Sequence, residues 1–184
     1  MKEGIEATGI DAPSPEAGVR RLNALSVEQA AAVLLGVCGS KRWVERMVAK
    51  RPFLTSAALL GEADRVWLAL DKADWLEAFA HHPRIGERDL GQTRFAATAA
   101  QSSREQSGMN AATDAQREEF ARGNAEYERK FGHVFLICAT GKSAAEMLAA
   151  LRSRMRNAPE VELKNSAAEQ AKIIRHRLEK WLAT

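Results

Sequence analysis

Cysteine is scarce in this chain of 184 residues, and no apolar run in it is long enough to span a bilayer. The two cysteines, Cys38 and Cys138, lie far apart in the sequence, which excludes a paired-thiol redox motif and a cysteine zinc cluster. Residues 1–14 carry charges of both signs and lack the apolar core of a secretory signal. These absences predict a cytoplasmic protein that does not enter a membrane.

Histidine is also rare, and its spacing does not indicate a metal site. The four histidines, at positions 81, 82, 133 and 176, include no His-x-x-x-His or His-Glu-x-x-His pair. The formal net charge is +3, but Lys and Arg alternate with Asp and Glu nearly everywhere, whereas a nucleic-acid-binding surface concentrates positive charge. We therefore expect neither a metal site nor a nucleic-acid partner.

The sequence does contain the composition of a globular protein, with 46% apolar and 28% charged residues. Its length suits one domain with a substantial core, since two domains would each be small. We assign residues 1–20 to a polar N-terminal segment whose composition allows flexibility, and residues 21–184 to a single domain.

Apolar residues recur at helical spacing through most of the chain, so we predict an all-α fold, a single-domain helical bundle. Helix boundaries are marked by capping residues, by glycines after the last turn and by prolines that end a helix. The predicted helices run from Ser26 to Leu35, from Ser40 to Pro52, from Ser56 to Leu70, around Trp75 and Phe79, from Asp114 to Gly132, from Ser143 to Met155 and from Val161 to Leu182.

One short stretch near residues 133–140, with the sequence HVFLICAT, has the composition of a strand. A single strand has no partner for its backbone groups, so it cannot form a sheet by itself. We therefore predict a short extended segment buried between helices, whose free main-chain amides and carbonyls can serve a ligand.

His82 lies where an apolar helix should end. Trp75, Phe79 and His82 are spaced four and three residues apart, so they share one helical face. Pro83 cannot continue a helix and Gly86 permits unusual backbone angles, which together predict a rigid helix terminus. A lone buried imidazole is more often structural than catalytic, but a fixed imidazole with an ordinary pKa near ~6.5 also suits proton transfer.

Two other charged residues have both a structural and a functional interpretation. Glu105 follows Ser102 by three residues, which indicates a helix N-terminus, a carboxylate that orients His82, or both. Arg177 follows Ile173 by one turn on a largely apolar face. A buried ion pair would explain this arginine, and so would a clamp for a carboxylate or imide oxygen.

The chain contains several short motifs whose order and spacing are specific as a set. They are RWV at 42–44, RPF at 51–53, HPRIG at 82–86, S-x-x-E-Q at 102–106, Y-x-x-K-F-G at 127–132, FLICA at 135–139 and I-I-x-x-R-L at 173–178. With these motifs the chain, from Leu22 onward, resembles the 2-oxo-4-hydroxy-4-carboxy-5-ureidoimidazoline (OHCU) decarboxylases of urate degradation.

This resemblance implies an all-helical domain that forms a homodimer and decarboxylates the ureidoimidazoline to S-allantoin without a cofactor. It implies that the catalytic residues are His82, Glu105 and Arg177. It further implies a substrate pocket lined by Pro83, Ser102, Gln106, Phe135, Leu136, Ile137, Cys138 and Ala139. The assignment of the arginine has competitors on the preceding helix, namely Arg152, Arg154 and Arg156.

Two other functional classes compete with this one. A non-enzymatic interaction or regulatory module would need an exposed apolar helix face rather than a polar pocket. A metal-dependent hydrolase would need clusters of metal ligands that the sequence does not contain.

Overall fold

The computed structural model describes residues 14–86 and 107–184, and within these ranges the chain is helical with no β-strand. The all-α prediction is therefore confirmed. None of the helices in these ranges is both long enough and apolar enough to cross a membrane. In chain order they are α1 (Pro15–Ala24), α2 (Val27–Val37), α3 (Lys41–Ala49), α4 (Ser56–Leu68), α5 (Lys72–Ala80), the short 3-10 helix η2 (Ser107–Met109), α7 (Asp114–Phe131), α8 (Ala144–Arg154) and α9 (Pro159–Leu182).

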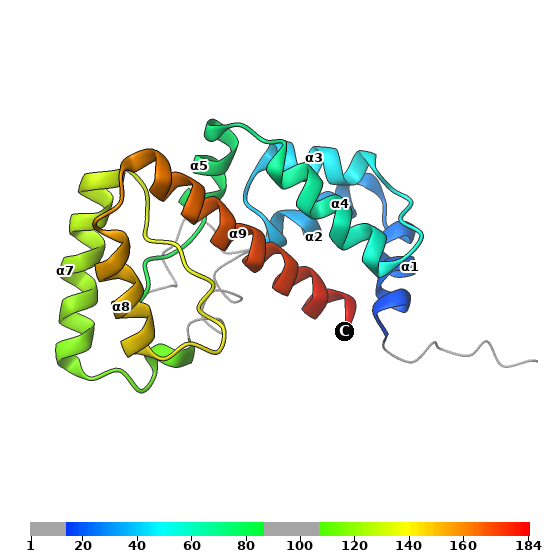
Figure 1. Cartoon of the computed structure of the whole chain (residues 1–184). Helices are drawn as coiled ribbons and strands as arrows, with labels where there is room; N and C mark the ends of the chain where they lie inside the picture. Colours follow the sequence, from blue (N-terminus) through cyan, green and yellow to red (C-terminus); the bar gives the residue numbers. More distant parts are fainter. Residues whose placement is uncertain (1–13, 87–106) are drawn as a thin grey trace, which may run out of the picture.

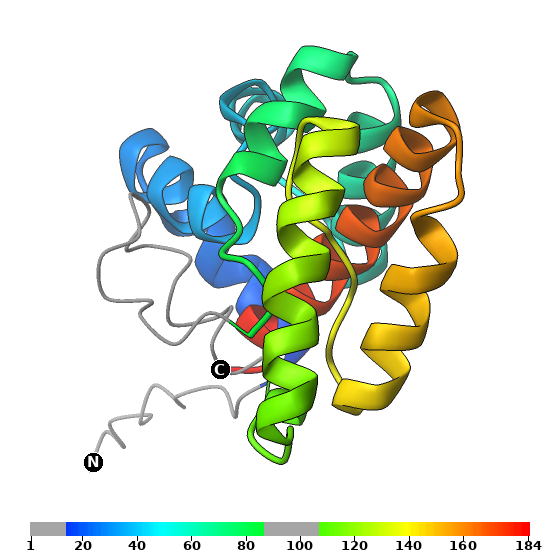
Figure 2. The same ribbon diagram turned by 90° about the vertical axis from the view of Figure 1, so that its left-hand side faces the viewer.

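The C-terminal helix α9 is the central element of the fold. It runs diagonally between α1–α4 on one side and the pair α7 and α8 on the other (Figure 1). After a turn of 90°, Figure 2 shows α7 and α8 packed side by side. Residues along α9 therefore face both groups of helices.

Two apolar clusters form the core of the part of the chain that the structure describes. The larger joins α1–α5 to α9, and its Trp67 side chain donates a hydrogen bond to the Ala167 oxygen of α9 at 2.9 Å. The smaller lies among α7, α8 and the segment between them, and it includes Tyr127 and Phe135. Burying each large apolar side chain of this kind stabilises the fold by roughly 1.5–3 kcal/mol. The larger cluster thus fixes α9 against α1–α5, and the smaller one packs α7 against α8.

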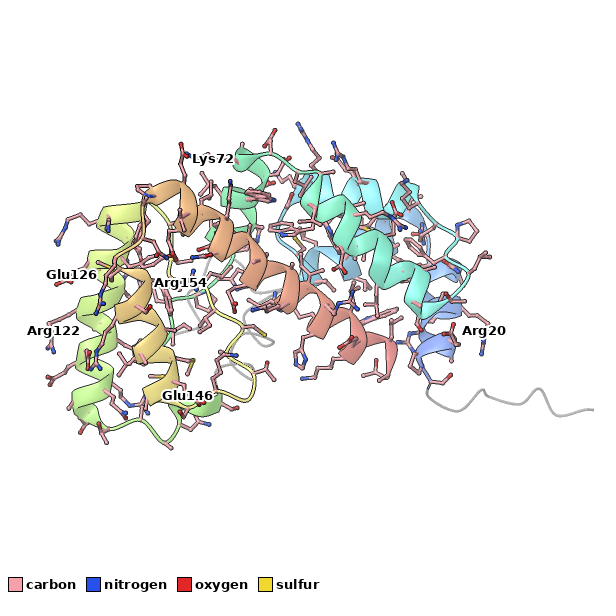
Figure 3. All side chains as sticks on the ribbon, in the orientation of Figure 1. Arg20, Lys72, Arg122, Glu126, Glu146 and Arg154 are labelled. Carbon is pink, nitrogen blue, oxygen red and sulfur yellow. The ribbon has the colours of Figure 1, made fainter. Side chains whose placement is uncertain are left out.

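A buried polar network also holds α7, α8 and α9 together. Arg154 at the end of α8 pairs at 2.6 Å with Glu162 of α9, which is fully buried. The Tyr127 hydroxyl of α7 donates to the same carboxylate, and Arg154 also donates to the Leu136 oxygen at 2.7 Å. Figure 3 shows Arg154 lying between α8 and α9. Burial by itself would raise the pKa of Glu162, but hydrogen bonds from Arg154 and Tyr127 hold it below its ordinary value, so the carboxylate stays ionised.

The capping residues predicted from the sequence begin several of the helices. Capping boxes are present at residues 26–29, before α2, and at residues 143–146, before α8. At α7 the prediction was one residue off, because Thr113 is the cap and Asp114 is the first helical residue. The Thr113 hydroxyl accepts a hydrogen bond from the Gln116 amide.

Two helices begin at prolines, and the sequence analysis predicted neither start. α9 begins at Pro159, slightly before the predicted start at Val161, because proline fits the first position of a helix. α1 begins at Pro15 and buries Val19. Residues 15–20, which the sequence analysis assigned to the polar N-terminal segment, therefore belong to a helix that packs against α9.

Candidate functional site

His82 directly follows the end of α5. His81 takes the C-cap position of this helix, and the His82 amide donates a hydrogen bond to the Phe79 oxygen at 3.0 Å. The next residue, Pro83, is buried. The predicted helix terminus is confirmed, and it brings the His82 side chain next to α9.

The segment that follows this imidazole is fastened to α7. Arg84 donates two hydrogen bonds to the Glu128 carboxylate, at 2.6 and 2.8 Å. The side-chain amide of Asn124 donates to the Ile85 oxygen at 2.9 Å. Gly86 has a φ of 85°, in the left-handed region that favours glycine. The backbone is thus held on both sides of the histidine, by α5 before it and by α7 after it.

Arg177 reaches the same place from the C-terminal half of α9. Its side chain is buried, and its Nη1 donates a hydrogen bond at 3.3 Å to the Val37 oxygen at the end of α2. Burial raises the pKa of the nearby Cys38 thiol to about 12 despite the charge of Arg177, so this thiol stays neutral. The end of α2, the end of α5 and α9 therefore meet at one point.

The surroundings of His82 keep its imidazole neutral. Burial and the charge of Arg177 lower the pKa of His82 to about 3, and Gln170 opposes this shift only in part. An unperturbed imidazole has a pKa near ~6.5, so these surroundings strongly disfavour the protonated form of His82. At neutral pH the imidazole therefore carries no proton to give, but it can accept one.

His81 has a different environment from His82. It packs against Gly39, and a methyl group at Gly39 would come within 2.3 Å of the His81 Cγ. Burial lowers the pKa of His81, Glu77 raises it and Lys41 lowers it further. The contact with Gly39 fixes the end of α5 against the connection between α2 and α3.

The segment between α7 and α8 is extended and buried, as predicted. Residues 135–137 and Ala139 are each at most 8% exposed. The Cys138 amide donates a hydrogen bond at 2.8 Å to the Glu169 side chain, which places the segment beside α9. Within the described residues, no group accepts a hydrogen bond from the main-chain amides of Ile137 and Ala139. These two amides are available to a ligand.

Of the four candidate arginines, Arg177 is the one whose charge acts on His82. Arg152 forms a surface ion pair with a carboxylate of α7. Arg154 belongs to the buried network with α9, and Arg156 is exposed. The described residues also contain a buried ion pair at another of these arginines, Arg154, whose partner is Glu162.

Three predicted site residues, Ser102, Glu105 and Gln106, lie outside the residues that the structure describes. Their roles remain predictions from the sequence. Within residues 14–86 and 107–184, no three His, Cys, Asp or Glu side chains gather as they would around a metal ion.

Sequence reasoning missed one residue of this site, Gln170. It is fully buried in α9 and lies next to His82, where it acts on the pKa of the imidazole. The available signal was its spacing, because Gln170 precedes Arg177 by two helical turns and so shares its face. The sequence alone could not show that this face meets the end of α5.

Comparison with known proteins gives a consistent result. A family model described as OHCU decarboxylase matches residues 23–179. The chain is 41% identical over 145 residues to the uric acid degradation bifunctional protein TTL of Arabidopsis thaliana, a match that covers 78% of this chain and 44% of that protein. It is 29% identical over 162 residues to the 2-oxo-4-hydroxy-4-carboxy-5-ureidoimidazoline decarboxylase of Amia calva, covering 88% and 92% of the two chains.

A solved structure has the same fold. It is a crystal structure of OHCU decarboxylase in the presence of (S)-allantoin, which matches with a TM-score of 0.70 and 36% identity over 82% of this chain and 96% of that one. The chain spans less than half of the Arabidopsis relative. The family model, by contrast, covers most of this chain. On this sequence and structural evidence, the chain belongs to the OHCU decarboxylase family.

Proposed function

We propose that this chain decarboxylates 2-oxo-4-hydroxy-4-carboxy-5-ureidoimidazoline to S-allantoin in urate degradation. The observation that carries the proposal is the position of a neutral imidazole, His82, beside the buried guanidinium of Arg177. A base next to a fixed positive charge suits an anionic substrate from which a proton must be moved. Family membership and the likeness to a structure obtained with (S)-allantoin support the same reaction.

The substrate itself explains why so small a set of residues is sufficient. It carries a carboxylate and a hydroxyl on one ring carbon, next to a carbon that is double-bonded to nitrogen. When the bond to the carboxylate breaks, its electron pair passes into the carbon–nitrogen double bond and carbon dioxide leaves. The substrate thus provides its own electron sink, and we propose that the reaction needs no cofactor.

In this proposal Arg177 binds the anionic substrate. Its planar guanidinium offers paired donors to a carboxylate or to a ring oxygen. Its charge also stabilises the negative charge that develops on the ring as carbon dioxide leaves. Because Arg177 is already held by the Val37 oxygen, little reorientation is required when the substrate binds.

His82 moves the proton. The neutral imidazole accepts the proton of the ring hydroxyl, whose oxygen becomes a carbonyl, and returns it to the neighbouring ring carbon. The ring nitrogen that received the electron pair takes a proton from solvent, which completes the balance. Because His82 delivers the proton to one face of the ring, a single enantiomer of allantoin forms. We propose that Glu105 orients the imidazole for this step.

Main-chain groups complete the proposed pocket. The amides of Ile137 and Ala139 are free to bind the amide-like ureido and ring edges of the substrate. We propose that the remaining pocket residues are Pro83, Ser102, Gln106, Phe135, Leu136 and Cys138. The buried polar groups around His82 favour this small-molecule site over a partner-binding apolar face.

The experiment follows urate oxidation by circular dichroism in the presence of hydroxyisourate hydrolase, with and without this protein. Rapid appearance of a single allantoin enantiomer is expected only when the protein is added, and His82→Ala should abolish it. Slow appearance of racemic allantoin at the same rate in both samples would reject the proposed activity.

We also propose that the protein is a cytoplasmic homodimer. Light scattering after size-exclusion chromatography should give twice the 20.2 kDa mass of one chain. A mass of one chain at micromolar concentration would contradict the dimer without affecting the proposed reaction.

A further inference from the structure

Gln170 is a buried amide whose polar atoms are left without partners. Its side chain is fully buried, and neither its Nε2 nor its Oε1 has a hydrogen-bond partner among the described residues. An unsatisfied buried amide destabilises a fold, so such groups are rare and call for an explanation.

Neighbouring polar residues on α9 show that the fold can satisfy such groups. Glu162 and Ser166 are also fully buried, and both receive hydrogen bonds from Arg154. The open amide of Gln170 is therefore not a general property of this helix.

Gln170 lies where the proposed substrate pocket is expected. It approaches the His82 imidazole closely enough to affect its pKa, without reaching hydrogen-bonding geometry. Arg177 is two turns further along the same helix face. The residue before Gln170, Glu169, accepts the hydrogen bond from the Cys138 amide, so the extended segment passes directly beside this position.

We infer that Gln170 is a substrate-binding residue, and that its amide pairs with an amide-like edge of the ligand. A primary amide offers one acceptor and one donor side by side, which match the N–H and C=O of a ureido group or of a ring amide. Two such hydrogen bonds satisfy both open atoms of Gln170 at once. This inference rests on the proposed function and names a further residue that recognises the substrate.

The test uses Gln170→Met, because methionine has nearly the length of glutamine and carries no amide. The matched control is Gln116→Met, since the Gln116 side chain already has its partner at the start of α7, where it accepts from the Thr113 amide at 2.9 Å. The measurements are kcat and KM on freshly generated substrate, the pH profile of kcat, the Kd for (S)-allantoin and the Tm.

For Gln170→Met we expect KM and the Kd for (S)-allantoin to rise about tenfold or more, since the ligand loses two hydrogen bonds. Because the pKa of His82 is already about 3, losing the effect of Gln170 on it should leave the pH profile of kcat near neutral pH unchanged. The Tm should rise because an unsatisfied amide has been removed. For Gln116→Met we expect unchanged KM and Kd and a slightly lower Tm, because a capping bond is lost.

If the wild-type protein is active and Gln170→Met has KM and Kd values within twofold of wild type, this inference is overturned and the proposed function is not. A shifted pH profile at unchanged KM would also overturn it, since Gln170 would then position His82 rather than bind substrate. A wild-type protein without decarboxylase activity would overturn the proposed function, and this inference with it.

Discussion

The charge of Arg177 acts directly on the imidazole of His82, although Arg177 lies in α9 and His82 directly follows α5. Together with burial it keeps the imidazole unprotonated in the free protein. An anionic substrate bound at Arg177 would offset that charge and so favour protonation of His82. Substrate binding would thus make His82 a stronger base, which the proposed transfer of the hydroxyl proton requires.

Replacing Arg177 by methionine should raise the pKa of His82, because a neighbouring positive charge is removed while burial remains. We expect the pH titration of the His82 ring protons, followed by NMR, to move upward. We also expect kcat/KM to fall about a hundredfold or more, since a charged group that stabilises the transition state is lost. Arg152→Met, which removes only a surface ion pair, is the control and should change neither value. An unchanged His82 titration in Arg177→Met would show that the charge does not act on the imidazole.

Acid should destabilise the protein through His82. The pKa of this residue is lowered from 6.5 to about 3 in the folded state, so between these pH values the unfolded chain binds a proton that the folded protein does not. Stability is therefore greatest above pH 6.5 and falls as the pH decreases, by up to about 1.4 kcal/mol per pH unit from this group.

This dependence is tested by urea unfolding of wild type and His82→Asn at pH ~4, ~5, ~6 and ~7. His81 and His133 also have lowered pKa values, so both proteins should lose stability in acid. The variant should lose less than wild type. Parallel curves for the two proteins would contradict the role assigned to His82.

Decarboxylation should depend on His82 and not on the histidine beside it. We expect His82→Ala or Glu105→Ala to lower kcat at least about a hundredfold while the circular dichroism spectrum remains helical, because a positioned acid or base is lost. His81→Asn should keep kcat within severalfold of wild type, since His81 packs against Gly39 and takes no part in the proposed proton transfer. Near-native turnover in either alanine variant would remove that residue from the mechanism.

The buried ion pair between Arg154 and Glu162 should matter more for stability than the exposed one between Arg152 and Glu119. Glu162→Gln leaves a buried guanidinium without its countercharge, which should lower the free energy of unfolding by about 3–5 kcal/mol. Glu119→Gln breaks an ion pair whose arginine is largely exposed and should cost about 1 kcal/mol or less. Urea unfolding of both variants gives the comparison, and equal losses would show that burial does not distinguish the two pairs.

Local sequence patterns predicted much of the fold. Helical spacing and capping residues depend on neighbours within a few positions, so the starts of α2 and α8 could be read from Ser26 and Ser143. Pro83 correctly predicted that His82 follows the end of a helix. The helix starts at Thr113 and Pro159 were missed by small margins, because a cap and a first helical residue differ only in backbone geometry.

The site was predicted less completely, because its properties depend on contacts between distant parts of the chain. The lowered pKa of His82 requires Arg177 to lie nearby, which no local pattern reveals. The pairing of Arg154 with Glu162, and the open amide of Gln170, likewise follow from how α9 packs. For Ser102, Glu105 and Gln106, only the sequence supports the predicted roles.

α9 is one uninterrupted helix of 24 residues, and this continuity sets a fixed length within the pocket. Gln170 and Arg177 are separated by two turns, about 10 Å along the helix axis, and a helix cannot stretch without breaking its own hydrogen bonds. If both residues bind the ligand as proposed, the separation of their backbone positions cannot adapt to it. This fixed spacing would discriminate by molecular size, because a compound too short to bridge the two positions loses one of the two contacts.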